Sequence, residues 1–310
     1  MAVRETLKPF DVPHGRPRGG GAVAFVFQGG GSLTAPQVGM LWALNDAGLQ
    51  ADLVVGSSAG ALNAVAYASD PSPAGLDRLE AMWMSLRRRH VAPLSVRTLL
   101  GAVTGRVDGL VSNSALGLLI EGAAVARTLR GTSIAAHVVV TDLASGTAVA
   151  LSDGDTVPAL LASCAFPGIY PPVQIGERLF VDGGVSADVP VLQAEELGAS
   201  VVYVLPAAGD DAVQARPRGP LALAYHALGQ ILESADRRDL AAARGPVHVL
   251  PAPVSAATNP VDFRDTPRLI DEGYRLATAW LADHMMQAGL DAGTDALPPD
   301  PSPRLIVGAI

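Results

Sequence analysis

Short, continuous apolar runs alternate along this chain with longer stretches in which apolar residues recur at helical spacing. Short runs are typical of strands buried on both faces, and the longer stretches are typical of helices. The runs predict strands at 22–27, 53–55, 135–141, 147–151, 173–175, 178–181, 201–205 and 247–250. The longer stretches predict helices at 36–47, 58–68, 76–88, 114–129, 157–165, 190–197, 221–243 and 266–286. Because the two kinds of element alternate, we expect an α/β fold with a mainly parallel central sheet covered on both faces.

Individual residues sharpen some of these boundaries. Thr34 is placed to cap the N-terminus of helix 36–47, and Gly48 lies just past its end. Four basic residues, 87–90, close helix 76–88. Cations are favourable at a helix C-terminus, and a role at lipid headgroups or a membrane surface is the alternative.

The polar stretches divide the chain into three parts. Residues 1–20 are polar, contain Pro and Gly, and are expected to form a loose arm. Residues 21–289 are expected to form one domain, with 91–130 as a candidate cap or lid because its first part lacks a clear period. Residues 290–310 are a Pro-rich tail.

The most informative stretch is residues 54–63, which read VVGSSAGALN. A strand-like run leads into a G-x-S-x-G motif centred on Ser58, and a helix-compatible stretch follows. This order of strand, tight turn and helix is the context that a nucleophile elbow requires. Glycines two residues before and two after the serine relieve crowding in a strained turn. Ser58 is therefore a candidate nucleophile, and a plain Gly-rich turn is the alternative.

Two further loops follow predicted strands, namely Gly29-Gly30-Gly31 and Asp182-Gly183-Gly184. Such loops gather at the carboxyl edge of an open α/β sheet. Acyl transfer needs a nucleophile, a group that takes its proton, and donors for the developing oxyanion. Ser58, Asp182 and the backbone N–H groups of Gly29, Gly30 and Gly31 can supply these three parts. For the glycines, a plain turn or a nucleotide-phosphate loop is the alternative, although neither nucleotide-binding glycine pattern is present.

Composition narrows the classes of function. The 310-residue chain carries a net charge of -8 at pH 7, which disfavours nucleic acid and anionic membranes as partners. Hydrophobic residues make up 49% of it, enough for a large core. Cys164 is the only cysteine, so no intrachain disulfide is expected, and we expect this residue to be small, buried and apolar in character. Neither a secretory signal nor an apolar run long enough to span a bilayer is found, so we predict a cytoplasmic location.

With these residues, the chain resembles the patatin-like phospholipases, a family of lipid acyl hydrolases. The motifs that carry the resemblance lie between residues 22 and 205, in the family's order: Gly29-Gly30-Gly31, Gly56-Ser57-Ser58-Ala59-Gly60, Ala165-Phe166-Pro167-Gly168 with Pro171-Pro172, and Asp182-Gly183-Gly184 with Pro190. The resemblance implies a three-layer α/β/α sandwich in which Ser58 is the nucleophile, Asp182 its base and the glycine loop the oxyanion hole. It also implies hydrolysis of carboxylic esters through a serine acyl-enzyme, with a lipid or small acyl ester as substrate and neither metal nor cofactor. Transient contact with a membrane surface remains open.

The chain departs from the family pattern at two places. Leu33 and Thr34 stand where the family usually has a basic residue followed by glycine, and Ala187 and Asp188 stand where asparagines are common. A missing cation beside the oxyanion loop affects phospholipid preference more than hydrolysis itself. We therefore expect a preference for neutral or single-chain acyl esters.

Other functions use the same residues. A Ser-His-Asp α/β-hydrolase would need a late histidine, for which His226, His248 and His284 are available. His248 lies in an apolar run and fits a structural role better. A non-catalytic lipid-binding or scaffolding protein could share the fold. An acyltransferase would use the same site residues as a hydrolase.

Overall fold

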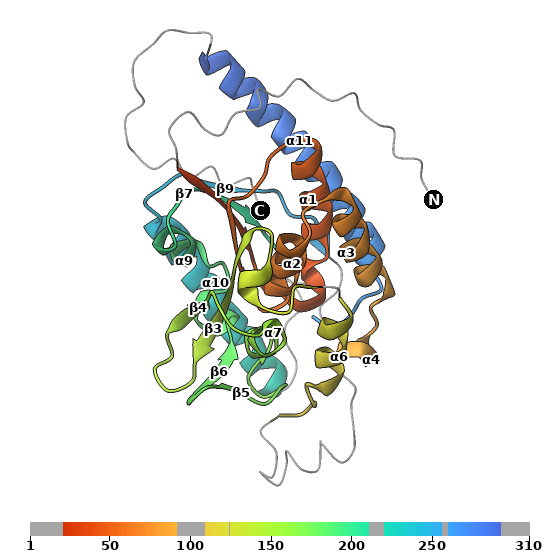
Figure 1. Ribbon diagram of the computed structural model, residues 1–310, viewed down its shortest axis with the longest axis vertical. Coiled ribbons are helices and arrows are strands. Elements are labelled where there is room, and N and C mark those ends of the chain that lie inside the picture. Colours follow the sequence, from red (N-terminus) through yellow and green to blue (C-terminus); the bar gives the residue numbers. More distant parts are fainter. Residues whose placement is uncertain (1–20, 92–108, 124, 211–219, 256–259, 293–310) are drawn as a thin grey trace.

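A large central sheet organises the computed structural model, which describes residues 21–91, 109–123, 125–210, 220–255 and 260–292 (Figure 1). Its strands lie in the order β5-β6-β3-β2-β1-β7-β9, and β4 also pairs with β3. Strands β3, β2, β1, β7 and β9 run parallel, whereas β4, β6 and β5 join as antiparallel neighbours. The bounds are β1 Ala22–Phe27, β2 Leu53–Ser57, β3 Ala135–Asp142, β4 Ala148–Leu151, β5 Val173–Ile175, β6 Arg178–Asp182, β7 Ala199–Leu205 and β9 Val247–Val249. Outside this sheet, β8 (Gly209–Asp210) pairs in parallel with β10 (Val254–Ser255).

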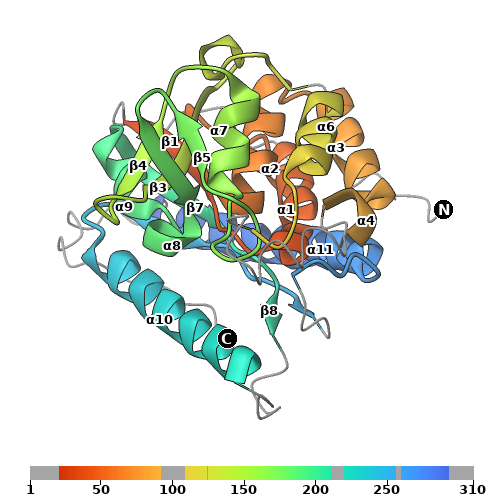
Figure 2. The same cartoon turned by 90° about the horizontal axis from the view of Figure 1, so that it is seen from below.

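Both faces of the sheet are covered by helices. In β1, Phe25 and Phe27 join one hydrophobic cluster while Ala24 and Val26 join another, as the two-residue period of a strand requires. On the first face, α2 and α7 contact the strands, and α1, α3 and α11 share the same hydrophobic cluster. On the second face, α8 and α9 contact the strands, and α10 packs against these two helices (Figures 1 and 2). The predicted three-layer α/β/α sandwich with a mainly parallel sheet is confirmed.

The helices mostly follow the predicted ranges. Their bounds are α1 Pro36–Asp46, α2 Ser58–Ser69, α3 Pro73–Ser85, α4 Arg88–Val91, α6 Ser114–Gly122, α7 Thr156–Ser163, α8 Gly184–Ala187, α9 Val191–Glu196, α10 Pro220–Ala242 and α11 Thr266–Ala292, with 3₁₀ turns at Gly31–Thr34 and Leu129–Gly131. Helix α11 therefore continues six residues beyond its predicted end at 286.

The prediction for Thr34 was wrong. Thr34 belongs to the 3₁₀ turn before α1, is fully buried, and its hydroxyl donates to the carbonyl of Gly31 at 2.9 Å. Its side chain therefore has no role as the helix cap. Pro36 begins α1 and has no N–H, so the first turn has one fewer donor to satisfy.

Two predicted helices have different limits. Helix α3 starts at Pro73 rather than 76, because the Ser72 hydroxyl accepts from the Gly75 N–H, and it ends where Leu86 becomes extended. The predicted helix 114–129 ends at Gly122. Leu129 lies instead in a separate 3₁₀ turn, where its side chain is buried.

The predicted arm (1–20), part of the predicted cap (92–108 and 124) and most of the tail (293–310) lie outside the described residues.

Candidate active site

Ser58 lies where strand β2 passes into helix α2, in the G-x-S-x-G turn that we call the elbow. Its φ is 52°, and it is the only non-glycine residue with positive φ in the described part of the chain. A Cβ at Gly56 would lie 2.6 Å from the Cα of Ala61, and one at Gly60 would lie 2.3 Å from the carbonyl oxygen of Gln28. Both distances are too short for a side chain, so the elbow requires glycine at these two positions. The predicted strand–turn–helix geometry is confirmed.

A serine on a different helix holds the backbone of the elbow. Ser163 lies at the end of α7, and its hydroxyl accepts from the Ser58 N–H at 2.8 Å while donating to the carbonyl of Val139 at 2.6 Å. Both groups of the hydroxyl are satisfied in a fully buried position. Ser163 was not predicted as a site residue. A single serine in an apolar helix was the only sign in the sequence.

Asp182 lies at the end of β6 and faces Ser58. The Ser58 hydroxyl donates to Asp182 Oδ2 at 2.7 Å, and the Gly184 N–H donates to Oδ1 at 2.8 Å. The Thr141 hydroxyl donates to the Asp182 carbonyl at 2.7 Å, which fixes the backbone. Burial raises the pKa of Asp182 to about 7, and the two hydrogen bonds to its carboxylate oppose that rise. The carboxylate is therefore a stronger proton acceptor than an exposed aspartate.

The glycine loop, Gly29–Gly31, lies beside Ser58. A Cβ at Gly29 would lie 3.2 Å from the Cβ of Ser58, which shows how closely the loop approaches the serine. Gly30 and Gly31 have φ of 141° and 60°, which side chains rarely adopt, and a Cβ at Gly31 would lie 2.3 Å from the carbonyl oxygen of Pro260. The Gly29 N–H donates to the carbonyl of Asp188 at 3.2 Å. Because the Gly29 N–H already has an acceptor, the hypothesis of an oxyanion hole is now limited to the N–H groups of Gly30 and Gly31 as its donors.

A buried network of polar side chains holds the residue that precedes the glycine loop, Gln28. Gln37 Nε2 donates to the carbonyls of Gln28 and Leu205, at 2.8 and 2.9 Å. Its Oε1 accepts from Asn63 Nδ2 at 2.8 Å, and Trp83 Nε1 donates to Asn63 Oδ1 at 2.7 Å. These interactions fix both amide orientations. They were not predicted, although a glutamine and an asparagine within apolar helices were the visible signal.

The basic cluster and Leu33 lie in different surroundings. Arg87 donates to the carbonyls of Met84 and Leu86, at 3.0 and 2.6 Å, so it satisfies the end of α3. This contact favours the helix C-terminus as the role of Arg87. Leu33, in the turn after the glycine loop, packs partly buried against the main core.

Cys164 was expected to be small, buried and apolar in character, and it is partly buried and packs against the main core. Its thiol faces the Ser58 hydroxyl and the Asp182 carboxylate, which was not expected. Burial raises its pKa above the usual range, and the negative charge of Asp182 adds to that rise. The thiol is therefore protonated at neutral pH. The reason for its position is that α7 ends at Ser163, directly beneath the elbow.

Two of the three histidines proposed for a triad, His248 and His284, stack on aromatic side chains. His248 stacks on Tyr203 with ring centroids 5.0 Å apart, and His284 stacks on Trp280 at 3.8 Å. Neither described ring interaction includes Ser58 or Asp182. The side chain of His226 lies outside the described residues.

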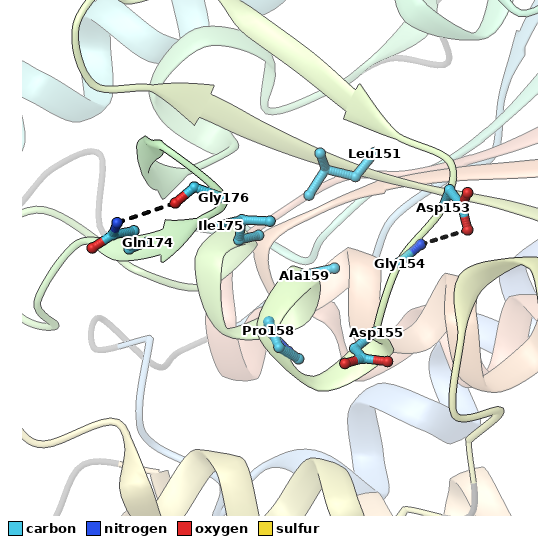
Figure 3. A pocket seen from close by; sticks show the side chains of 9 residues that line it. All are labelled: Leu151, Asp153, Gly154, Asp155, Pro158, Ala159, Gln174, Ile175 and Gly176. Atoms are coloured by element: carbon cyan, nitrogen blue, oxygen red, sulfur yellow. Dashed lines mark hydrogen bonds between the residues drawn. The ribbon is translucent and has the colours of Figure 1, made fainter.

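A cavity of about 270 Å³ lies elsewhere on the molecule, and Figure 3 shows the side chains that line it. It is lined by Leu151, Asp153, Gly154, Asp155, Pro158, Ala159, Gln174, Ile175 and Gly176. Neither Ser58 nor Asp182 lines it, and Asp153 pairs with Arg130 at 2.8 Å. The candidate site at the elbow is therefore separate from this cavity.

Within the described ranges, no cluster of three or more His, Cys, Asp or Glu side chains is arranged to hold a metal ion. None of the helices in these ranges combines the length and apolar character needed to cross a membrane.

Comparison with known proteins places these features in a family. A sequence model of the patatin-like phospholipases matches residues 25–195. An uncharacterised NTE family protein of Mycobacterium tuberculosis is 33% identical over 178 residues, which are 55% of this chain and 28% of that protein. Patatin-like phospholipase domain-containing protein 7 of Rattus norvegicus is 26% identical over 188 residues, 60% of this chain and 14% of that protein. The chain therefore spans less than a third of the length of these curated relatives.

Solved structures show a more distant likeness. VipD from Legionella pneumophila is 15% identical with a TM-score of 0.40, over 84% of this chain and 66% of that one. The type III effector ExoU is 16% identical with a TM-score of 0.33, over 85% of this chain and 53% of that one. The family model itself covers more than half of this chain and contains the glycine loop, the elbow and Asp182. The chain belongs to the patatin-like phospholipase family.

Proposed function

We propose that this protein is a lipid acyl hydrolase that cleaves carboxylic esters through a serine acyl-enzyme, with Ser58 and Asp182 as its catalytic dyad. The observation that carries the proposal is the 2.7 Å hydrogen bond from the Ser58 hydroxyl to Asp182 Oδ2, in a strained elbow. Family membership supports lipid substrates. No histidine need intervene, because the hydroxyl donates directly to a carboxylate that can accept its proton.

In the first half of the reaction, Ser58 Oγ attacks the acyl carbon and its proton passes to Asp182 Oδ2. The N–H groups of Gly30 and Gly31 stabilise the oxyanion that forms on the former carbonyl oxygen. Collapse of this intermediate breaks the bond to the alcohol, which leaves with the proton from Asp182. The acyl group then remains on Ser58.

In the second half, a water molecule attacks the acyl carbon while Asp182 accepts its proton. Collapse of the second tetrahedral intermediate releases the carboxylic acid, and the proton returns to Ser58 Oγ. The buried Asp182 carboxylate suits both steps, because a pKa of about 7 lets it accept and release a proton at neutral pH.

The direct test is covalent labelling. A fluorophosphonate probe should label the wild-type protein, and peptide mapping should place the label on Ser58. The Ser58→Ala variant should remain unlabelled and lose about 10³-fold or more in kcat/KM for a medium-chain p-nitrophenyl ester. Labelling elsewhere, or hydrolysis by this variant above a tenth of the wild-type rate, contradicts the proposal.

Histidine variants distinguish the dyad from a triad. His226→Ala, His248→Ala and His284→Ala should each retain most of the ester hydrolysis of the wild type. Loss of activity in one of them, with its thermal unfolding unchanged, would replace the dyad with a Ser-His-Asp mechanism. A protein that neither labels nor hydrolyses esters would instead be a non-catalytic lipid-binding or scaffolding protein on this fold.

A further inference from the structure

Asp188, which follows α8, holds the residue before the glycine loop through its side chain and the loop itself through its main chain. Its Oδ2 accepts from Gln28 Nε2 at 3.1 Å, and its carbonyl accepts from the Gly29 N–H at 3.2 Å. The orientation of the Gln28 amide is fixed, because its Oε1 accepts from the Ala207 N–H at 3.0 Å. The amide nitrogen must therefore face Asp188. Two hydrogen bonds between the same two segments act as a clamp.

The carboxylate of Asp188 is also close to that of Asp182. Its Oδ1 lies 2.7 Å from the position that a Cβ on Gly184 would take, and Asp182 Oδ1 lies 3.2 Å from the same position. The two oxygens are therefore at most about 6 Å apart, a distance at which like charges in a buried site interact strongly. Asp188 Oδ1 also lies 2.2 Å from the Cβ position of Gly29, so it sits between the glycine loop and Asp182.

The titratable groups that face Asp188 in the described structure are acidic. Asp182 faces it from β6 and Asp236 from α10, where Asp236 Oδ1 accepts from the Val189 N–H at 3.2 Å. Glu233 and Asp239 lie beside Asp236 on the same helix. The two arginines of α10 interact with other acidic side chains: Arg237 pairs with Glu233 at 2.7 Å, and the charge of Arg238 opposes the rise that burial causes in the pKa of Asp239.

These surroundings determine when Asp188 is charged. Burial raises the pKa of Asp188 to about 7, the Gln28 hydrogen bond lowers it, and the charge of Asp182 raises it again. Burial and the charge of Asp188 likewise raise the pKa of Asp236 to about 7. Near neutral pH, three neighbouring carboxyl groups therefore compete for protons, and their titrations are linked.

We propose that Asp188 is a positioning residue for the reaction: its carbonyl and carboxylate hold the glycine loop in place, and its negative charge tunes the proton affinity of Asp182. The proposal rests on the function proposed above. The charge of Asp188 makes Asp182 a stronger base, because two close carboxylates resist being ionised together. The same charge moves the pH range of full activity upward.

Asp188→Asn separates the two effects. The asparagine oxygen can still accept from Gln28 Nε2, so the clamp remains, but the charge is lost. The acid limb of kcat/KM for a neutral p-nitrophenyl ester should move to lower pH by about one unit. Asp188→Ala removes both the charge and the acceptor for Gln28. At pH 9 it should lose about tenfold or more in kcat, whereas Asp188→Asn should stay within about threefold of wild type.

The experiment measures kcat/KM from pH 5 to 9.5 for the wild type, both Asp188 variants and Asp70→Asn. Asp70→Asn is a matched control because this substitution also removes one negative charge. Asp70 lies at the far end of α2, where its side chain pairs with Arg78. Asp70→Asn should leave the acid limb in place. An acid limb that stays fixed in Asp188→Asn, or that moves equally in Asp70→Asn, would overturn the proposal.

Thermal unfolding supplies a second readout that does not depend on turnover. A carboxyl whose pKa is raised in the folded state loses stabilising free energy as pH rises through that pKa. Replacing Asp188 by Asn should therefore raise Tm more at pH 8.5 than at pH 5.5. Equal changes at both pH values would contradict a buried charge at this position. A wild type without ester hydrolysis or probe labelling at any pH would instead overturn the proposed function, and the role of Asp188 with it.

Discussion

The elbow and the acid loop, residues Asp182–Asp188, meet at one hydrogen bond but are held by different forces. The elbow is fixed by shape: its glycines leave no room for a Cβ, and its serine N–H is held by the neutral hydroxyl of Ser163. The acid loop is fixed by charged groups, since both of its aspartates accept hydrogen bonds with their carboxylates. The geometry of the nucleophile should therefore be insensitive to pH, whereas the proton acceptor should not be.

This difference implies opposite pH trends for activity and stability. Asp182 must be ionised to accept a proton from Ser58, so activity should rise with pH up to about 7, the pKa that burial gives this carboxyl. The folded-state pKa is raised, so stability from this group is complete below its unfolded pKa and is lost as pH rises through about 7. The conditions that activate Asp182 are the ones in which its buried charge weakens the fold.

The largest expected effect is at the elbow. Ser58→Ala should lower kcat/KM by about 10³-fold or more, because no other nucleophile replaces the hydroxyl. The alanine keeps the N–H that donates to Ser163, so the free energy of unfolding should change by about 1 kcal/mol at most. Ester hydrolysis above a tenth of the wild-type rate, in protein free of contaminating esterase, would disprove the role of Ser58.

Asp182→Asn tests the acid loop with the shape preserved. It should lower kcat by about 10²- to 10⁴-fold with little change in KM, because an amide cannot accept the proton. Wild-type kcat/KM should fall about tenfold per pH unit below pH 7, and this slope should disappear from any residual activity of the variant. A variant that keeps the acid limb would show that a different group titrates.

Gly60→Ala tests the steric account of the elbow. Its Cβ would lie 2.3 Å from the Gln28 carbonyl oxygen and 2.6 Å from that of Phe27, so stability should fall by about 3 kcal/mol or more. Gly229→Ala is the matched control in α10, where a Cβ meets no atom within 4 Å. The control should be stabilised by about 0.5–1 kcal/mol, because alanine restricts the unfolded chain. Urea unfolding measures both, and equal effects would refute the steric account.

The smallest expected effect concerns substrate choice at Leu33. The wild type should turn over a neutral p-nitrophenyl ester well and phosphatidylglycerol vesicles weakly, because its net charge of -8 opposes an anionic surface. Leu33→Arg should raise kcat/KM on the vesicles by about tenfold, the size of one charge-assisted hydrogen bond, and leave the neutral ester nearly unchanged. Rapid wild-type turnover of the vesicles, unchanged or lowered in the variant, would refute this preference.

The sequence by itself determined the strand–helix alternation, the elbow, the glycine loop and the position of Asp182 near the end of a strand, although the strand includes Asp182. These features depend on interactions within a few residues: side-chain periodicity, the need for glycine in a crowded turn, and the short loops of an α/β fold. The family resemblance rests on the same local motifs and was confirmed.

Only the tertiary structure decided what surrounds the Ser–Asp pair. Ser58 meets Ser163 across 105 residues and Gln28 meets Asp188 across 160, and no local pattern records such partners. The same limit explains why the surroundings of Thr34 and Cys164 were not predicted. The predictions for both side chains were based only on neighbouring residues in the sequence. Thr34 is buried in a turn, and Cys164 faces the reacting groups, because packing between distant segments determines which side chains become buried, satisfied or charged.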